Sequence, residues 1–331
     1  MELALSALAP ETPDAPVTHG LTRSEIKELH SQAHRERRDI EPDIEIFLED
    51  SENGYTAISE SASRVSEMGS ELSKIKTVAE ARASKYWPLF KGAMEEEISE
   101  KMENAAWTVI ERPSDETVHN SRWVFAIKLN DDNSIKTVKA RFVGCGYSQV
   151  EGKDFDSVFA ATLPGVSFRM LIAWIADEDL DTDHIDAVKA FTQAGIDKRV
   201  LVNSPEGFTV DNLPPAISKY CLLLQMALEG IKQGANLWFG LNRAAWLRLG
   251  CKSWLNETNL YHHDGIQLRV GVFADDTRCG FKHEYRPQYR AMKREYAKII
   301  KIGSSDTIAP ALKFTGVQIS RDRDARTITI H

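Results

Sequence analysis

The stretch 260–276, LYHHDGIQLRVGVFADD, constrains the fold more than any other part of this sequence. Its Asp264–Gly265 pair stands between two alternating or apolar runs, which is the strongest short-range signal for a β-hairpin. The second run ends in two adjacent carboxylates, Asp275 and Asp276. Adjacent like charges repel unless something positive lies between or in front of them. This strand end is therefore either a solvated turn or part of a cation site.

The rest of the chain predicts a mixture of helices and short strands. Apolar side chains recur at steps of three and four residues over 86–104, with the acidic run Glu95–Glu97 expected on the solvated face. A buried helix is expected over 166–179, a strand running into a helix over 181–195, and a helix over 284–300 that carries Tyr289 and Tyr296 on one stripe. Strands are expected over 107–113, 121–130, 135–149, 312–322 and 326–331, with a strand pair over 198–208. Because the hairpins favour antiparallel pairing, the sequence predicts an α+β fold.

The charge of the chain is uneven. The formal net charge is −8 over 331 residues, and residues 1–100 carry 11 Lys and Arg against 21 Asp and Glu. We expect residues 1–83 to form an acidic, largely disordered arm or linker, and residues 84–331 to form the folded domain. The near-neutral remainder can still bind nucleic acid if its basic side chains gather on one face.

Cysteine spacing and hydropathy limit the class of protein. Cys145, Cys221, Cys251 and Cys279 form no C-x-x-C pair, so neither a zinc site nor a disulfide framework is indicated. The first ten residues lack the basic region of a secretory signal, and no run of about 18 apolar residues occurs. We expect a reduced, intracellular protein that does not contact a membrane.

A third carboxylate changes the interpretation of the acid pair. A pair alone is weak evidence, because Asp131 and Asp132 form the same pair in an ordinary hairpin turn. Asp186, however, ends another apolar-bounded strand in HIDAVKAF and can approach Asp275 and Asp276 on one sheet. Three carboxylates at strand ends can hold two Mg²⁺ ions, which prefer oxygen ligands and promote phosphoryl transfer.

Seven sequence blocks in a fixed order carry a family resemblance. They are RWVFAIKLN, VKARFVGCGYSQVEGKDFDSVFA, FRMLIAW, IDAVKAF, VLVNSPEGF, LEGIKQGANLWF and GVFADD. Each block is loose, but the ordered set resembles the reverse transcriptase domain of copia-type retrotransposons over about residues 84–331. The resemblance implies the fingers and palm of a right-hand polymerase, with an antiparallel sheet packed on helices.

The resemblance implies catalytic and metal-binding roles for three residues. Asp186, Asp275 and Asp276 match the metal-binding aspartates, which would hold two Mg²⁺ ions, with Mn²⁺ as an alternative. Phe191 matches an aromatic steric gate that favours deoxynucleotides; an ordinary core phenylalanine is the alternative.

Further positions match the nucleotide and nucleic-acid contacts of the family. Lys139 and Arg141 match basic residues that clasp the triphosphate, with a solvated ribbon edge as the alternative. Gln233 matches a nucleotide-binding position, and Gly230 with Lys232 matches the block that positions template and primer. Three further side chains are given ordinary roles: Trp238 in the core, and His262 and His263 at the surface.

The chain also departs from the family pattern. Phe273–Ala274 replaces Tyr-Val, Cys145 replaces a common Lys, and Glu229 adds a negative charge where phosphates are expected to pass. The family continues into a thumb, a connection and a ribonuclease H domain where this sequence ends at His331.

Three functional hypotheses follow. The first is an RNA-directed DNA polymerase that uses an RNA or DNA template, a primer and deoxynucleotides, in a cytoplasmic virus-like particle or the nucleus, with the other Pol domains supplied in trans. The second is a catalytically inactive or host-retained fragment that binds nucleic acid or protein. The third is a stand-alone metal-dependent phosphoryl-transfer enzyme of another kind.

Overall fold

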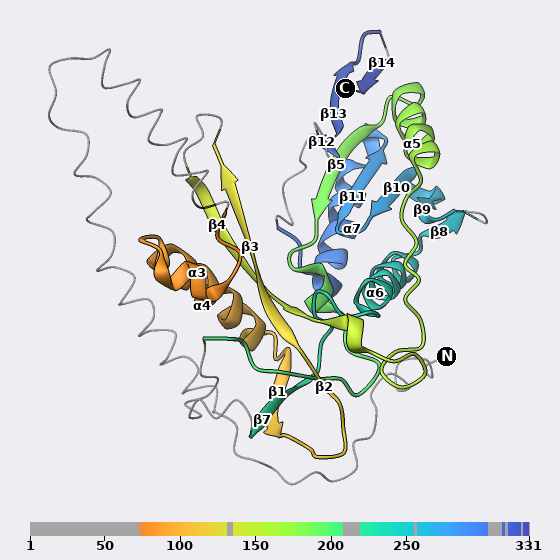
Figure 1. Cartoon of the computed structure of the whole chain (residues 1–331). Helices are drawn as coiled ribbons and strands as arrows, with labels where there is room; N and C mark the ends of the chain where they lie inside the picture. The colour runs from red at the N-terminus through yellow and green to blue at the C-terminus, as the bar shows by residue number, and fades with distance from the viewer. Residues whose placement is uncertain are drawn as a thin grey trace, which may run out of the picture.

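The fold has two walls with a hollow between them. The computed structural model describes residue 72 and residues 74–130, 135–207, 219–254, 257–303, 313–314, 317–325 and 327–330. In Figure 1 a long two-stranded ribbon with two helices forms one wall, and a five-stranded sheet with its helices forms the other. A small sheet lies at the base of the ribbon.

The ribbon wall consists of β3 (Ser121–Leu129) and β4 (Ile135–Gly144), packed on α3 (Val78–Ala83) and α4 (Trp87–Glu103). The ring of Phe90 in α4 meets that of Phe125 in β3 edge to face at 4.8 Å. Leu72 and Ile75 are buried in the same cluster. The folded part therefore includes residues before the expected boundary at residue 84, because these side chains complete the packing of α4. The remainder of the expected arm, residues 1–71, lies outside the described residues.

The small sheet has the strand order β1 (Trp107–Glu111), β7 (Tyr220–Leu224), β6 (Leu201–Val202) and β2 (Val118–His119). Among the described strand pairs, only β2 and β6 run parallel. The strand pair expected over 198–208 is wrong, since only β6 forms there and it pairs with β2 and β7. Phe208 of that segment lies outside the described residues.

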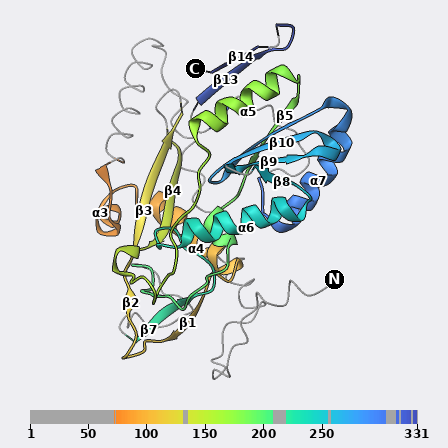
Figure 2. The ribbon, with the colours of Figure 1, turned by 90° about the vertical axis from the view of Figure 1, so that its right-hand side faces the viewer.

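The five-stranded sheet has the order β5 (Asp181–Asp186), β11 (Asp276–Phe281), β10 (Leu268–Phe273), β9 (Glu257–His263) and β8 (Lys252–Trp254), all antiparallel. Figure 2 shows α5 (Gly165–Asp177) above these strands and α6 (Gly234–Arg248) below them. The close approach of α5 requires two glycines. A Cβ at Gly271 or Gly280 would meet Leu171 or Ile175 at 2.6 and 2.7 Å.

Helix α7 (Arg286–Ile299) joins α6 on the other face, where Tyr289 and Tyr296 are buried as the helical stripe predicted. The last strands, β12 (Lys313–Phe314), β13 (Val317–Asp322) and β14 (Thr327–Ile330), form a three-stranded sheet, and Ile319 packs with α5. No helix in the described ranges is long and apolar enough to cross a membrane.

The mixed α/β architecture with antiparallel sheets is confirmed, as are the strands 121–129 and 135–144 and the hairpin of β9 and β10. The helix expected after Asp186 is only the short 3-10 turn η5 (Ala190–Gln193). Helix α5 buries one face alone, since Val166 is 74% exposed. The turn at 131–134 lies outside the described residues. All four cysteines are free thiols.

Candidate active site

The sheet brings the three predicted carboxylates to one end. Asp186, the last residue of β5, lies directly opposite Asp276, the first residue of β11. Asp275 occupies the tight turn between β10 and β11, and its carbonyl oxygen accepts a hydrogen bond from the Ala187 amide at 3.1 Å. Ala274 takes a left-handed conformation with φ +53°, which reverses the chain before the acid pair. The turn is thus tied to the end of β5.

The electrostatics of this end are unfavourable for three negative charges. Burial raises the pKa of Asp186, and the neighbouring charges of Asp275 and Asp276 raise it further. His184 and Lys139 act in the opposite direction on the same carboxyl group. Asp276 is itself paired with His184, whose Nε2 lies 3.0 Å from Oδ1. The site therefore has an excess of negative charge that its own cations relieve only in part.

The donor set fits a hard cation, because carboxylate oxygens are the ligands that Mg²⁺ prefers. In the described part of the chain, however, no three or more His, Cys, Asp or Glu side chains are grouped closely enough to hold a metal ion.

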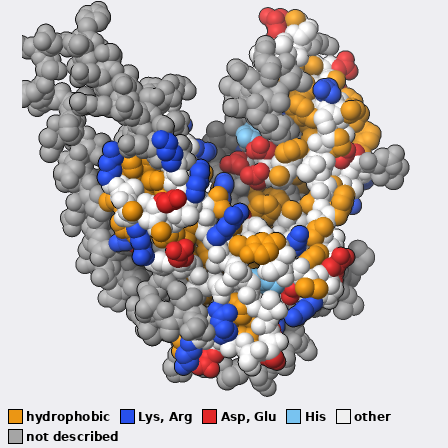
Figure 3. All heavy atoms as spheres, in the orientation of Figure 1, with side chains coloured by type: hydrophobic (Ala, Val, Ile, Leu, Met, Phe, Trp, Pro, Cys, Tyr) orange, Lys and Arg blue, Asp and Glu red, His pale blue; other side chains and the backbone are white. Residues whose placement is uncertain are grey.

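The opposite wall is basic. Lys139 and Arg141 lie on one face of β4, and the cross-strand register places Arg122 and Lys128 of β3 on that same face. All four side chains are exposed, whereas Trp123 and Phe142 on the other face are buried. Figure 3 shows Lys and Arg side chains on the ribbon wall and a group of acidic side chains with a histidine across the hollow. The charge of Lys139 acts to lower the pKa of Asp186 across this hollow.

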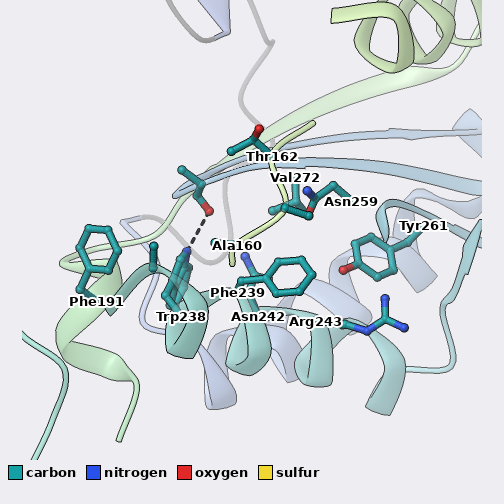
Figure 4. Close-up of a pocket in the computed structure, with 13 residues that line it drawn as sticks. Ala160, Thr162, Phe191, Trp238, Phe239, Asn242, Arg243, Asn259, Tyr261 and Val272 are labelled. Atoms are coloured by element: carbon teal, nitrogen blue, oxygen red, sulfur yellow. Dashed lines mark hydrogen bonds between the residues drawn. The ribbon is translucent and has the colours of Figure 1, made fainter. Parts of the chain in front are cut away.

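Phe191 lies in η5, five residues after Asp186, and is partly buried. It packs beside Trp238 of α6 at one end of a cavity that also contacts Ala274 (Figure 4). The indole nitrogen of Trp238 donates a hydrogen bond to the Ala274 carbonyl oxygen at 2.9 Å. Trp238 is buried as expected, and it also holds the turn that carries the acid pair.

Comparison with known proteins identifies the family. Residues 104–331, more than half of the chain, match the family described as reverse transcriptase (RNA-dependent DNA polymerase). The chain belongs to the reverse transcriptase family. This confirms the resemblance carried by the sequence blocks.

The curated relatives include Pol polyproteins from transposons. The Retrovirus-related Pol polyprotein from transposon RE1 of Arabidopsis thaliana is 29% identical over 190 residues, which are 57% of this chain and 12% of the relative. The corresponding polyprotein from transposon TNT 1-94 of Nicotiana tabacum is 29% identical over 147 residues, 44% of this chain and 11% of the relative. An uncharacterized mitochondrial protein of Arabidopsis thaliana is 29% identical over 80 residues, which cover 24% of this chain and 47% of the relative. The chain thus spans a small part of the polyproteins that it matches, and the family together with these relatives supports a reverse-transcriptase-like function.

In this member of the family, Gln233 is fully buried rather than open to the hollow. Its Oε1 accepts a hydrogen bond from Gln149 at 3.1 Å, and its Nε2 donates to the Asp154 carbonyl oxygen at 2.8 Å. These contacts fix the loop that follows β4. They fit a positioning role better than direct contact with a nucleotide.

Gly230 has a structural reason for being glycine. Its φ is +86°, and a Cβ there would lie 2.3 Å from the carbonyl oxygen of Gly144 at the end of β4. The amide of Gly146 donates to the Gly230 carbonyl oxygen at 3.0 Å. Gly230 therefore joins the ribbon to the segment that leads into α6, while the neighbouring Lys232 is exposed.

A buried ion cluster corrects the expectation for Glu97 and supplies a partner for Glu229. Glu97 was expected on the solvated face of α4, but it is 2% exposed, because Lys101 at 3.2 Å and Lys189 neutralise it. Burial raises the pKa of Glu97, but these two ammonium groups outweigh burial and lower it below its ordinary value. Glu229 joins the cluster through Lys101 at 2.9 Å. Its charge is therefore paired with that of Lys101.

Cys145, His262 and His263 make their contacts with residues other than the three carboxylates. Cys145 is partly buried, and its amide donates to the Asn120 carbonyl oxygen at 2.7 Å. His262 and His263 are partly buried rather than fully at the surface, and His262 Nδ1 lies 2.8 Å from the carboxylate of Asp264. Neither histidine faces Asp275 and Asp276, because both lie beside the first residues of β10, whereas the two aspartates follow its last residue.

Proposed function

We propose that this chain is an RNA-directed DNA polymerase that adds deoxynucleotides to the 3′-hydroxyl of a primer. The observation that supports this function best is the placement of three carboxylates at the ends of adjacent strands, facing an exposed basic ribbon across a hollow. An acidic strand end suits the reacting phosphate through bound cations, and a basic face suits the polyanionic substrates. In this proposal the ribbon wall is the fingers and the five-stranded sheet is the palm.

The carboxylates of Asp186, Asp275 and Asp276 would hold two Mg²⁺ ions, or Mn²⁺ in their place. Bound there, such ions would supply Lewis-acid activation of the hydroxyl and stabilisation of the pyrophosphate leaving group. The raised pKa of Asp186 supports this assignment, since burial and two like charges leave the site in need of positive charge.

Residues of the ribbon, of η5 and of the segment before α6 would bind and select the nucleotide. Lys139 and Arg141 are exposed and lie on the same face, so their cationic groups are free to contact a triphosphate. Phe191 lines the same cavity as Ala274, the residue directly before the acid pair, and a bulky ring there would exclude a 2′-hydroxyl. Gly230 and Gln233 would act indirectly, by holding the ribbon and its following loop against α6, and Lys232 would contact template or primer.

The partners in this proposal are an RNA or DNA template with a primer, together with deoxynucleotides. The other domains of a Pol polyprotein would act with this chain in trans, in a virus-like particle or in the nucleus. We place no membrane among the partners.

Primer extension on poly(rA) with an oligo(dT) primer and Mg²⁺ tests the polymerase. The expected result is extension by the native chain and none by the Asp275→Asn, Asp276→Asn double variant. The matched control is Glu95→Gln, Glu96→Gln, which converts two adjacent exposed carboxylates of α4 to amides and is expected to leave extension unchanged. Equal extension by the native chain and the aspartate variant would refute the proposal.

A second function is favoured by the exposed basic face of the ribbon, which suits a polyanion whether or not the chain polymerises. The chain would then bind nucleic acid through the ribbon face without polymerising. Filter binding of the same primer–template separates the two functions. Salt-sensitive binding that is lost on Lys139→Gln, Arg141→Gln, with no extension by a folded native chain, would establish this second function.

A further inference from the structure

A separate cavity lies between α6 and strands β9 and β10. Figure 4 shows its lining, which is largely aromatic and aliphatic and includes Phe191, Trp238 and Phe239. Its volume is about 80 Å³, which is too small for a nucleotide but sufficient for part of a small planar molecule. No acidic side chain is among the residues that line it.

Three hydrogen-bond donors that line this cavity have no partner within the described structure. They are Nδ2 of Asn242, Nδ2 of Asn259 and Nη1 of Arg243. Asn242 and Asn259 are 2% and 1% exposed, so solvent does not satisfy them. A hydrogen bond fixes the orientation of the Asn242 amide, since its Oδ1 accepts from the Tyr296 hydroxyl of α7 at 2.9 Å. Leaving such donors unpaired is costly, which indicates that an acceptor group completes the site.

The guanidinium of Arg243 also interacts with Tyr261. Burial raises the pKa of Tyr261 to about 12, while Arg243 acts to lower it. The phenol thus stays protonated, and the only formal charge in the lining is the positive charge of Arg243. A cationic group with two neutral amide donors favours an anionic acceptor.

The cavity is distinct from the candidate active site. Tyr261 pairs with Val270, so it lies on the sheet face that α6 and α7 cover. Asp276 pairs with Asp186 and Phe273, whose side chains alternate onto the other face. Among the residues that line the cavity, Ala274 directly precedes the acid pair and Phe191 lies five residues after Asp186.

We propose that this cavity binds a small aromatic monocarboxylate. The carboxylate accepts hydrogen bonds from Arg243, Asn242 and Asn259, since a planar guanidinium matches the geometry of a carboxylate. Because the cavity holds only part of such a molecule, the carboxylate lies inside it and the ring packs at the end lined by Phe191 and Trp238. This inference does not depend on polymerase activity.

Calorimetric titration of the full chain with benzoate tests the inference. The neutral isostere benzamide and inorganic phosphate are titrated in parallel. We expect benzoate to bind at least tenfold more tightly than benzamide, and phosphate not to compete. Arg243→Met and Asn259→Leu are each expected to weaken benzoate at least tenfold. Arg248→Met, an exposed arginine on the same helix, is expected to change nothing.

The stability of the ligand-free variants excludes a purely structural role. Because the Asn259 amide nitrogen has no partner in the described structure, Asn259→Leu is expected to unfold at a urea concentration no lower than that of the native chain. A marked loss of stability would show that the amide is already satisfied, for instance by a fixed water, and would overturn the inference. No benzoate binding, equal binding of benzamide, or Arg243-dependent binding of phosphate alone would overturn it as well.

Discussion

Lys293 of α7 is the substitution site with the clearest expected effect on stability. Its ammonium group lies 2.8 Å from the carboxylate of Asp183, and the two side chains are 2% and 0% exposed. The hydroxyl of Tyr289 donates a second hydrogen bond to the same carboxylate at 2.6 Å. Asp183 lies in β5, the strand that ends at Asp186, so this ion pair fastens α7 to the strand that carries a candidate catalytic residue.

The change Lys293→Met keeps the length of the side chain and removes its charge. The Tyr289 hydrogen bond remains, but the buried carboxylate loses the cation in direct contact with it. Breaking a buried ion pair by removing one partner costs about 3–5 kcal/mol, because the remaining charge is not resolvated. Adding Asp183→Asn removes that charge at nearly constant volume. The double variant is therefore expected to be more stable than Lys293→Met alone.

Urea unfolding, followed by far-UV circular dichroism and tryptophan fluorescence, measures these differences. The matched control is Lys298→Met on the same helix, whose ion pair with Glu295 is 69% and 55% exposed and is expected to contribute under about 1 kcal/mol. The reasoning is refuted if Lys293→Met costs no more than the control, or if Asp183→Asn destabilises the Lys293→Met background further.

Three further outcomes are expected. Gly230→Ala should destabilise the fold by about 1–3 kcal/mol because of the positive φ, and by more because the new Cβ would clash with the end of β4. Gly240→Ala, which has open space around it, should instead stabilise α6 by about 0.5–1 kcal/mol. Thermal unfolding of the two variants measures both effects. Burial raises the pKa of Asp181, but hydrogen bonds from Arg286 and Arg323 hold it below its ordinary value. This contribution is present above the unfolded pKa of about 3.9 and is lost as the pH falls through the lower folded value, so the stability difference between the native chain and Asp181→Asn should shrink below about pH 4 in urea titrations. On the proposed function, Phe191→Ala should raise ribonucleotide incorporation relative to deoxynucleotide incorporation in primer extension; unchanged selectivity would assign Phe191 to the core alone.

Local sequence pattern was sufficient to predict the hairpin of β9 and β10. An alternating run, a turn signal and a terminal acid pair predicted the strand that ends before Asp275, because the period of two and the turn chemistry are local properties. The helix at 286–299 was equally readable, since its tyrosines recur at helical spacing. Trp238 was correctly placed in the core, although its hydrogen bond to Ala274 had no signal in the sequence.

Long-range pairing explains where sequence interpretation failed. Glu97 lies in a run of three glutamates, and only Lys101 and Lys189, the latter 92 residues further along the chain, make its burial possible. The sequence likewise gave no sign that the charge of Glu229 is paired with Lys101, which lies 128 residues earlier in the chain. Gln233 and Gly230 matched family positions, but burial and a backbone contact with the ribbon decide what they can touch.

The sequence by itself determined the α+β composition, the family and the identity of the three acidic residues, because periodicity, turn signals and ordered motifs are properties of the chain. The tertiary structure alone decided which charges meet. It placed Asp186 opposite Asp276, turned the basic face of the ribbon toward them, and left three donors unpaired beneath the sheet. The physical reason is that electrostatic and hydrogen-bond energies depend on distance and burial in the folded state, and neither is fixed by separation along the chain.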